Sequence, residues 1–262
     1  MGLPIRPGAV FGIVKELRST TDRPLLVTGV LADQLTRALA AGGDQTAIRT
    51  GGRPDEVAAL IHVIGDTVTE EDERVLKLAH RARVPTIVVA AGREAPLRIP
   101  FVLATDVVRV EPGHGFSTEA IARAVAQKLG EEATSVARRL PVLRPAVCTQ
   151  LIESFSRKNG LIGAAVFIPG VDLPVLTLHQ IRMVLRICAA YGLEVDRERA
   201  PELIATIGAG LGFRALAREL LDFVPVLGWI VKGAVAYAGT KALGEAAVRY
   251  CEVRTAVGSP TN

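Results

Sequence analysis

The sequence predicts two domains: an α/β domain with a doubly wound, mostly parallel sheet over residues 1–135, and an apolar all-α bundle over residues 136–262. Strand-like apolar runs alternate with helical runs as far as residue 129, which is the pattern of a parallel sheet. Beyond that point the alternation stops, and apolar residues recur at helical spacing. Hydrophobic residues make up 49% of the 262 positions, enough for two cores.

Five apolar runs in the first half have strand character. They are nearly continuous, as expected for strands whose two faces are both covered by helices. The predicted strands lie within LLVTG (25–29), QTAIRT (45–50), VAALIHVIG (57–65), VPTIVVAAG (84–92) and FVLATDVVRV (101–110).

Helices are predicted between these strands, over residues 9–17, 33–41, 70–83 and 118–129. Short polar residues stand where three of the helices begin, and such residues cap exposed N–H groups. We expect Asp33, Thr69 and either Ser117 or Thr118 to be these caps.

The second half is predicted to form a helical bundle, after a linker of mixed charge at 130–145 for which partial helix is an alternative. Its apolar runs are broken by proline, by Asp172 and by Lys232, so none reads as a membrane span. Surface contact with lipid remains an alternative, with residues 167–170 as the place for it. The predicted helices cover 147–157, 161–167, 175–191, 200–210, 213–223 and 228–251.

Two stripes mark these helices. Small residues every fourth position indicate either a close helix crossing within the bundle or a seam for self-association. Arg182 and Arg186 form a positive stripe, which is a solvated face or a site for an acidic partner or a lipid headgroup. The small-residue stripe consists of Ala234, Ala238, Ala242 and Ala246.

Composition excludes several classes of function. The net charge of +4 is spread along the chain without a basic run, so we expect no specific nucleic-acid partner. The cysteines (Cys148, Cys188 and Cys251) are sparse and predicted to be buried, as suits a cytoplasmic protein with no signal peptide. The histidines (His62, His80, His114 and His179) share no ligand spacing, so no metal site and no cofactor are predicted.

The segment GVLADQLT, residues 29–36, lies where an α/β protein commonly holds phosphate. Compared with the P-loop pattern G-x-x-x-x-G-K-[ST], Gly29 and Thr36 match, whereas Gln34 and Leu35 replace the second glycine and the lysine. Asp33, as the expected helix cap, would occupy the N–H groups that an anion needs. We therefore predict a degenerate phosphate-loop position at Gly29, Asp33 and Thr36, and no catalytic residue.

The order of elements over residues 20–130 resembles the Ras-like GTPase family. VAALIHVIGD and the following run to VPTIVVAAGRE are similar to that family's fourth strand through its base-reading strand. Where the family has N-K-x-D, this chain has Ala90, Ala91, Gly92 and Arg93, and no D-x-x-G motif is evident. The resemblance implies a GTPase-like fold without GTP hydrolysis.

Residues 145–253 resemble the bacterial family called "domain of unknown function 697". The resemblance rests on P-G-x-D-x-P in LIGAAVFIPGVDLPVLTL, a helix ending in Tyr-Gly, G-x-G-x-x-x-R in GAGLGFR, and a Gly-Thr-x-A-x-G helix. Members commonly follow a GTPase domain, and some are described as membrane proteins. The resemblance implies no defined activity.

These observations predict a non-catalytic, pseudo-GTPase-type binding or assembly protein. Its expected partners are a protein or a second copy, with peripheral contact at the inner face of the cell membrane as a further option. One alternative is an enzyme that binds a nucleotide or small molecule in the strand-end crevice, lined by Thr36, Asp66 and Arg93. Another is a purely structural protein, either a homo-oligomer or the partner of a true GTPase.

Overall fold

A computed structural model of the chain describes residues 7–19, 22–92, 98–110, 113, 115–165, 173–195, 200, 206–207 and 228–258. Arg93, His114, Asp172, the segment 167–170 and the predicted helix 213–223 lie outside the described residues. Of the predicted helix 200–210, only residues 200, 206 and 207 are described, and all three are helical.

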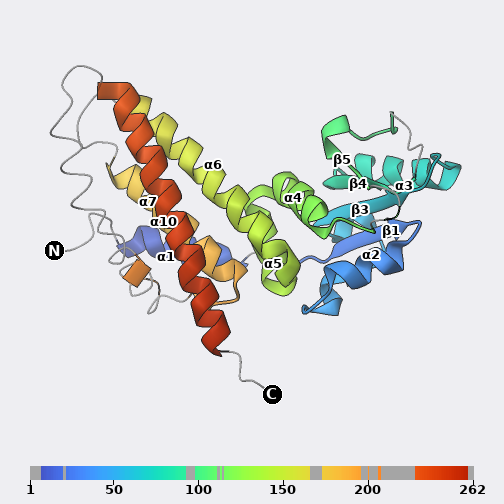
Figure 1. Cartoon of the computed structure of the whole chain (residues 1–262), viewed down its shortest axis with the longest axis horizontal. Helices are drawn as coiled ribbons and strands as arrows, with labels where there is room; N and C mark the ends of the chain where they lie inside the picture. Colours follow the sequence, from blue (N-terminus) through green and yellow to red (C-terminus); the bar gives the residue numbers. More distant parts are fainter. Residues whose placement is uncertain are drawn as a thin grey trace. The chain divides into compact units, whose positions relative to one another are not determined.

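The chain forms two compact units (Figure 1). One is Thr21–Val147, and the other joins Met1–Thr20 to Cys148–Asn262. The division therefore falls later than the predicted boundary at 135/136, and the first helix belongs with the helical unit. We call the two the α/β unit and the helical unit.

The α/β unit is built on a five-stranded parallel sheet in the order β2-β1-β3-β4-β5. The chain moves from β1 to one edge of the sheet, then returns past β1 to build the other side. That reversal is the mark of a doubly wound sheet and confirms the predicted parallel architecture. The strands are β1 (Leu25–Gly29), β2 (Ile48–Arg49), β3 (Ala59–Ile64), β4 (Thr86–Ala90) and β5 (Val107–Arg109).

Both faces of the sheet are covered. All six residues of β3 are buried, and alternate ones face opposite sides. On one face, Ile64 belongs to the same buried cluster as Leu76 of α3 (Glu70–Arg81). Leu60 belongs to a second cluster with Ala79 of the same helix. Helix α2 (Ala32–Leu39) contacts β1, and α4 (Thr118–Leu129) contacts β4 and β5.

The edge strands are shorter than their apolar runs predicted. Before β2, the Asp44 carboxylate accepts the Thr46 N–H at 2.8 Å and caps a 3₁₀ turn, η1 (Gln45–Ala47). A second 3₁₀ turn, η3 (Ala104–Asp106), precedes β5. Another 3₁₀ turn, η2 (Pro54–Glu56), precedes the central strand β3.

The predicted linker is helical in part, as the sequence allowed, and it is packed structure of the α/β unit. It contains η4 (Gly130–Glu132), α5 (Ala133–Arg139) and η5 (Pro141–Leu143). Apolar side chains of this stretch, among them Val136, Leu140 and Leu143, are at most 2% exposed. The Arg139 guanidinium also donates to Asp44 at 2.9 Å, tying α5 to the turn before β2.

The helical unit contains α1 (Pro7–Ser19), most of α6 (Arg144–Ala165), α7 (Leu173–Ala190) and α10 (Gly228–Gly258). We predicted two helices with a break at 158–160, and this is wrong because α6 is continuous. Gly160 lies inside it, and a Cβ there would be 3.2 Å from the Cβ of Tyr237 and 3.3 Å from the Gly233 oxygen. This glycine allows α10 to pass close to α6 (Figure 1).

The predicted alanine stripe is not the buried seam of α10. Ala234 and Ala238 are exposed, and Ala242 and Ala246 are half-buried. A neighbouring stripe, also of small residues, faces the bundle instead. It comprises Gly233, Thr240, Gly244, Ala247 and Cys251, all of them buried.

A polar network lies inside this apolar unit. The Asn159 amide of α6 donates to the Thr240 hydroxyl of α10 at 2.9 Å, and both residues are fully buried. From α7, Gln180 donates to the same hydroxyl at 3.2 Å, and a ring nitrogen of His179 lies 3.0 Å from the Asn159 oxygen. The network fixes the register of three helices, since a slip would leave buried polar groups unsatisfied.

The cysteines are all buried, as predicted. The sulfur atoms of Cys188 on α7 and Cys251 on α10 are 3.5 Å apart. The hydrogen bond with Cys188, together with burial, raises the pKa of the Cys251 thiol.

The arginine stripe of α7 faces an acidic group of the same chain. Both Arg182 and Arg186 donate to one carboxylate oxygen of Glu16 in α1, the latter at 2.8 Å. The Arg186 side chain is only 8% exposed. With Val10, Ile13 and Val14 buried nearby on α1, the pair holds the first helix on the helical unit.

Replacing Glu16 with glutamine should lower the free energy of unfolding by about 1–2 kcal/mol, because a buried guanidinium loses a charged partner. The expected loss is smaller than for a fully buried ion pair because the Glu16 side chain is 44% exposed to solvent. Denaturant unfolding measures it. The control is Glu119→Gln, which removes an exposed pair with Arg123 and should change stability by less than about 0.5 kcal/mol. Equal losses in the two variants would contradict the prediction.

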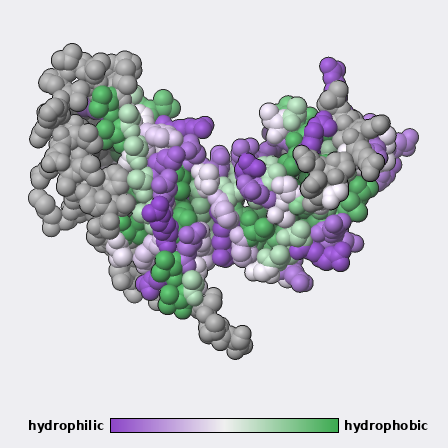
Figure 2. Space-filling view, in the orientation of Figure 1, coloured by the Kyte–Doolittle hydropathy of each residue, from purple (hydrophilic) through white to green (hydrophobic). Residues whose placement is uncertain are grey.

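None of the helices in the described part of the chain has both the length and the apolar run that crossing a membrane requires. Figure 2 shows hydrophobic surface at the C-terminal end of α10, where Val253 is 64% and Val257 81% exposed.

Candidate functional site at the carboxyl edge of the sheet

The connection from β1 to α2 contains only Val30 and Leu31. Gly29 ends the strand with φ +93°, and the Val30 N–H then donates to the Val63 oxygen at 3.0 Å. Leu31 takes a left-handed conformation, with φ 56°, and is the N-cap of α2. The strand therefore passes into the helix by a tight turn.

Asp33 is not the N-cap, so that prediction is wrong. It is the second residue of α2, whose N-cap is Leu31 and has no side-chain hydrogen bond. The N-cap lies two residues earlier than expected because Leu31 adopts the left-handed conformation that reverses the chain. In the first turn, the Asp33 carboxylate still interacts favourably with the helix dipole.

Residues 32–36, which would curl around phosphate in a P-loop, are helical here. The Leu35 N–H donates to the Leu31 oxygen at 3.1 Å, and the Leu35 side chain is fully buried. Thr36 lies in the second turn, and its hydroxyl oxygen is buried without a hydrogen-bond partner. The structure thus places Gly29, Asp33 and Thr36 along one turn and helix. Ligand binding by these three residues stays a prediction.

Gly29 is required by the sheet itself. A Cβ at this position would lie 2.0 Å from the Val63 oxygen of the neighbouring strand. The match to the first glycine of a P-loop therefore has a structural cause that involves no phosphate.

Of the crevice residues named from the sequence, Asp66 follows β3 and packs directly against Gly92. A Cβ on Gly92 would be 2.5 Å from an Asp66 carboxylate oxygen and 2.5 Å from its nitrogen. Gly92 follows β4. Thr36 turns its hydroxyl into buried surroundings.

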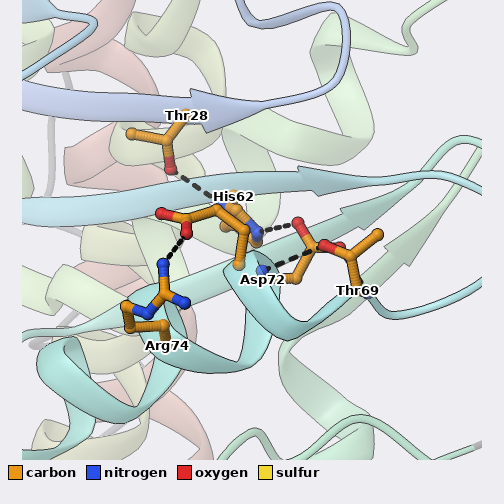
Figure 3. Close-up of polar contacts among 6 residues, drawn as sticks. Thr28, His62, Thr69, Asp72 and Arg74 are labelled. Atoms are coloured by element: carbon orange, nitrogen blue, oxygen red, sulfur yellow. Dashed lines mark hydrogen bonds and ion pairs between the residues drawn. The ribbon is translucent and has the colours of Figure 1, made fainter.

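Sequence reasoning missed a chain of polar side chains at the same edge of the sheet (Figure 3). Thr28 of β1 and His62 of β3 are paired in register, with the hydroxyl 2.8 Å from the imidazole Nδ1. His62 Nε2 lies 2.8 Å from an oxygen of Asp72, in the first turn of α3. Thr69 donates its N–H and hydroxyl to the second Asp72 oxygen, both at 2.8 Å.

One signal for this group was present in the sequence. His62 interrupts the apolar run VAALIHVIG, and a polar residue inside a buried strand needs partners. It is 2% exposed. Thr69 was predicted as a cap, and it forms a capping box with Asp72, so Asp72 serves both the helix and the histidine.

Ionisation fixes the direction of these hydrogen bonds. Burial alone would raise the pKa of Asp72, but hydrogen bonds from Thr69 and His62 lower it, so the carboxylate is charged and accepts only. His62 Nε2 therefore carries the proton, and Nδ1 accepts from the Thr28 hydroxyl. Burial lowers the pKa of His62 against the opposing effect of Asp72, which keeps the imidazole neutral.

Acidification should destabilise the α/β unit. Below its ordinary pKa of 6.5, His62 binds a proton in the unfolded chain but not in the folded one. As the pH is lowered from 6.5, the free energy of unfolding therefore decreases, until the pH reaches the lowered pKa of His62 in the folded chain. Asp72 adds a loss at lower pH, since its stabilisation is present above 3.8 and disappears as pH falls through its folded pKa. Urea unfolding between pH 7 and pH 5 should show a slope of up to about 1.4 kcal/mol per pH unit. His62→Gln should flatten this slope, and an unchanged slope would contradict the assignment.

No group of three or more histidine, cysteine, aspartate or glutamate side chains within the described ranges is arranged to hold a metal ion.

The structure thus joins a parallel α/β unit to a helical unit packed through small residues. The family described as "Domain of unknown function (DUF697)" matches residues 126–261, more than half of the 262 residues, and the chain belongs to it. The match begins in α4 and so covers the end of the α/β unit as well as the helical unit after α1. The search of curated proteins found no match, and the search of solved structures also found none.

Proposed function

We propose that the protein is a non-catalytic binding and assembly protein whose α/β unit is a pseudo-GTPase-type domain. The observation that carries the proposal is the β1–α2 turn. This turn contains only two residues, and the N–H group of one of them, Val30, already donates to the Val63 oxygen. A turn this short leaves no loop to wrap phosphate. The fully buried Leu35 stands where a P-loop has its lysine.

The second support lies at the end of β4. In a GTPase-like chain this position carries the side chains that read guanine, whereas here Ala90 is buried and Gly92 packs on Asp66. The described part of this strand end thus offers neither an amide nor a carboxylate of its own for a base. On this proposal, packing takes the place of both halves of a nucleotide site, the phosphate loop and the base reader.

Calorimetry with GTP, GDP and ATP should therefore detect no binding tighter than about 10 μM. The test should include magnesium, because the metal contributes to nucleotide affinity in ordinary GTPases. Binding tighter than this limit would overturn the pseudo-GTPase proposal in favour of an enzyme that uses the strand-end crevice.

For the helical unit we propose a role in contact with a protein partner, either a true GTPase or a second copy. Supporting this are exposed apolar residues on its helices, with Leu161 of α6 at 72% exposed besides Val253 and Val257 of α10. Pull-down from the native host would test for a GTPase partner. Light scattering showing a strict monomer at micromolar concentration would count against self-association.

Peripheral contact with the inner face of the cell membrane is the further proposal for this unit, within a cytoplasmic protein. Flotation of the purified protein with liposomes tests it. Protein that stays wholly at the bottom of the gradient would rule it out, while Leu161→Ser should reduce flotation if the apolar surface of α6 is the contact.

A further inference from the structure

Thr28, His62 and Asp72 lie at the point where the strand order of the sheet reverses. In a doubly wound sheet, the crevice outside the carboxyl ends of the two strands at the reversal is where ligands bind. Here these strands are β1 and β3. Thr28 is the next-to-last residue of β1, and His62 is its register partner on β3.

We propose that Thr28 is a reactive hydroxyl that accepts an acyl group from an activated ester. His62 would act as its general base and Asp72 as the positioning residue for His62. The proposal goes beyond the binding role above and is compatible with it, because it is a single acylation of the protein's own side chain without turnover. It concerns neither the helical unit nor nucleotide phosphates.

The geometry is that of a hydroxyl, an imidazole and a carboxylate joined in series. The two links, Thr28 to Nδ1 and Nε2 to Asp72, are both 2.8 Å, within the range for a nucleophile and its base. Compared with serine hydrolases the two ring nitrogens exchange roles, but the order of functions is the same. Asp72 is itself held by both donors of Thr69, so the imidazole has one orientation.

Accessibility distinguishes Thr28 from its partners. His62 and Asp72 are buried, at 2% and 8% exposed, whereas Thr28 is half-buried. The next residue, Gly29, which ends the strand, is exposed. Thr28 is thus the least buried member of the series, and its base lies on the buried side of it.

The transfer balances without any further reactant. The Thr28 oxygen attacks the ester carbonyl carbon, while its proton moves to His62 Nδ1. A carbon–oxygen bond to Thr28 forms, and the bond from the carbonyl carbon to the leaving alkoxide or phenolate breaks. The proton on Nδ1 then passes to the leaving oxygen, returning His62 to its neutral form beside the charged Asp72.

The test uses the full chain with p-nitrophenyl acetate as the probe and mass spectrometry of peptides to locate the acetyl group. We expect acetylation at position 28 in the wild type and in Thr28→Ser, but none at this position in Thr28→Val. His62→Gln should slow labelling of Thr28 by about 100-fold or more, in line with loss of a general base. Thr86→Val is the matched control, since Thr86 is a strand threonine whose hydroxyl donates to the Val84 oxygen at 3.0 Å.

Acetyl groups found on lysines but not on Thr28 would overturn the proposal, and the series would then be a structural lock between β1, β3 and α3. Labelling of Thr28 that is equally fast in His62→Gln would overturn it as well. If His62→Gln fails to fold by circular dichroism, Asp72→Asn takes its place, and unchanged labelling in that variant has the same meaning. Calorimetry with nucleotides is a separate readout, so failure here and failure of the pseudo-GTPase proposal are distinguishable.

Discussion

Replacing Gly29 with alanine should destabilise the α/β unit by about 4 kcal/mol, or prevent it from folding. A φ of +93° costs an L-residue about 1–2 kcal/mol, and overpacking adds about 1–3 kcal/mol. The added Cβ would meet the Val63 oxygen at 2.0 Å and the Val63 carbon and nitrogen at 2.9 Å. These atoms belong to the central strand β3, which cannot move without breaking its pairing with β4.

Gly42→Ala is the matched control for this substitution. Gly42 also has a positive φ, +68°, but nothing lies within 4 Å of the place that its Cβ would occupy. Its replacement should cost only the conformational part, about 1–2 kcal/mol. Urea unfolding of the two variants separates the collision from the backbone conformation, and equal losses would show that Val63 is not in the way.

Gly233→Val should destabilise the helical unit by about 3 kcal/mol. At this position α10 crosses α6 so closely that a Cβ would lie 2.9 Å from the Gly160 oxygen and 3.0 Å from the Ala164 Cβ. Valine would force the two helices apart and disturb the hydrogen bond between Asn159 and Thr240 as well. Thermal and denaturant unfolding followed by circular dichroism would measure the loss.

Ala238→Val provides the comparison on the same helix. Ala238 is exposed, so valine there should cost no more than its helix propensity, about 0.6 kcal/mol. A loss in Gly233→Val no larger than in Ala238→Val would contradict the close crossing. A larger loss in Ala238→Val that grows with protein concentration would instead identify the alanine stripe as a self-association seam.

Strands with continuous apolar runs were predictable because burial on both faces leaves a signal in the local sequence. This holds for β3 and β4. The bounds of β2 and the continuity of α6 were not predictable in the same way. Gly160 costs a helix about 1 kcal/mol locally, which reads as a break, yet α10 makes that glycine necessary from a distant part of the chain.

The candidate site divides in the same manner. The absence of a phosphate-binding lysine was readable from Leu35 alone. The series of Thr28, His62 and Asp72 was not, because it depends on β1 and β3 being neighbours, and strand order is a property of the whole sheet. Asp33 was misplaced for a local reason, since a left-handed leucine is an uncommon way to begin a helix.

The position of α1 has a consequence for how the chain is made. Glu16 leaves the ribosome 166 residues before Arg182 and 170 before Arg186, the two groups that hold it. During that interval the α/β unit is complete and can fold, because domains fold as units in the order of synthesis. During the same interval α1 has not yet met α7, on which it packs in the folded chain. A chaperone or the α7 of another copy can therefore bind α1 before the helical unit has folded.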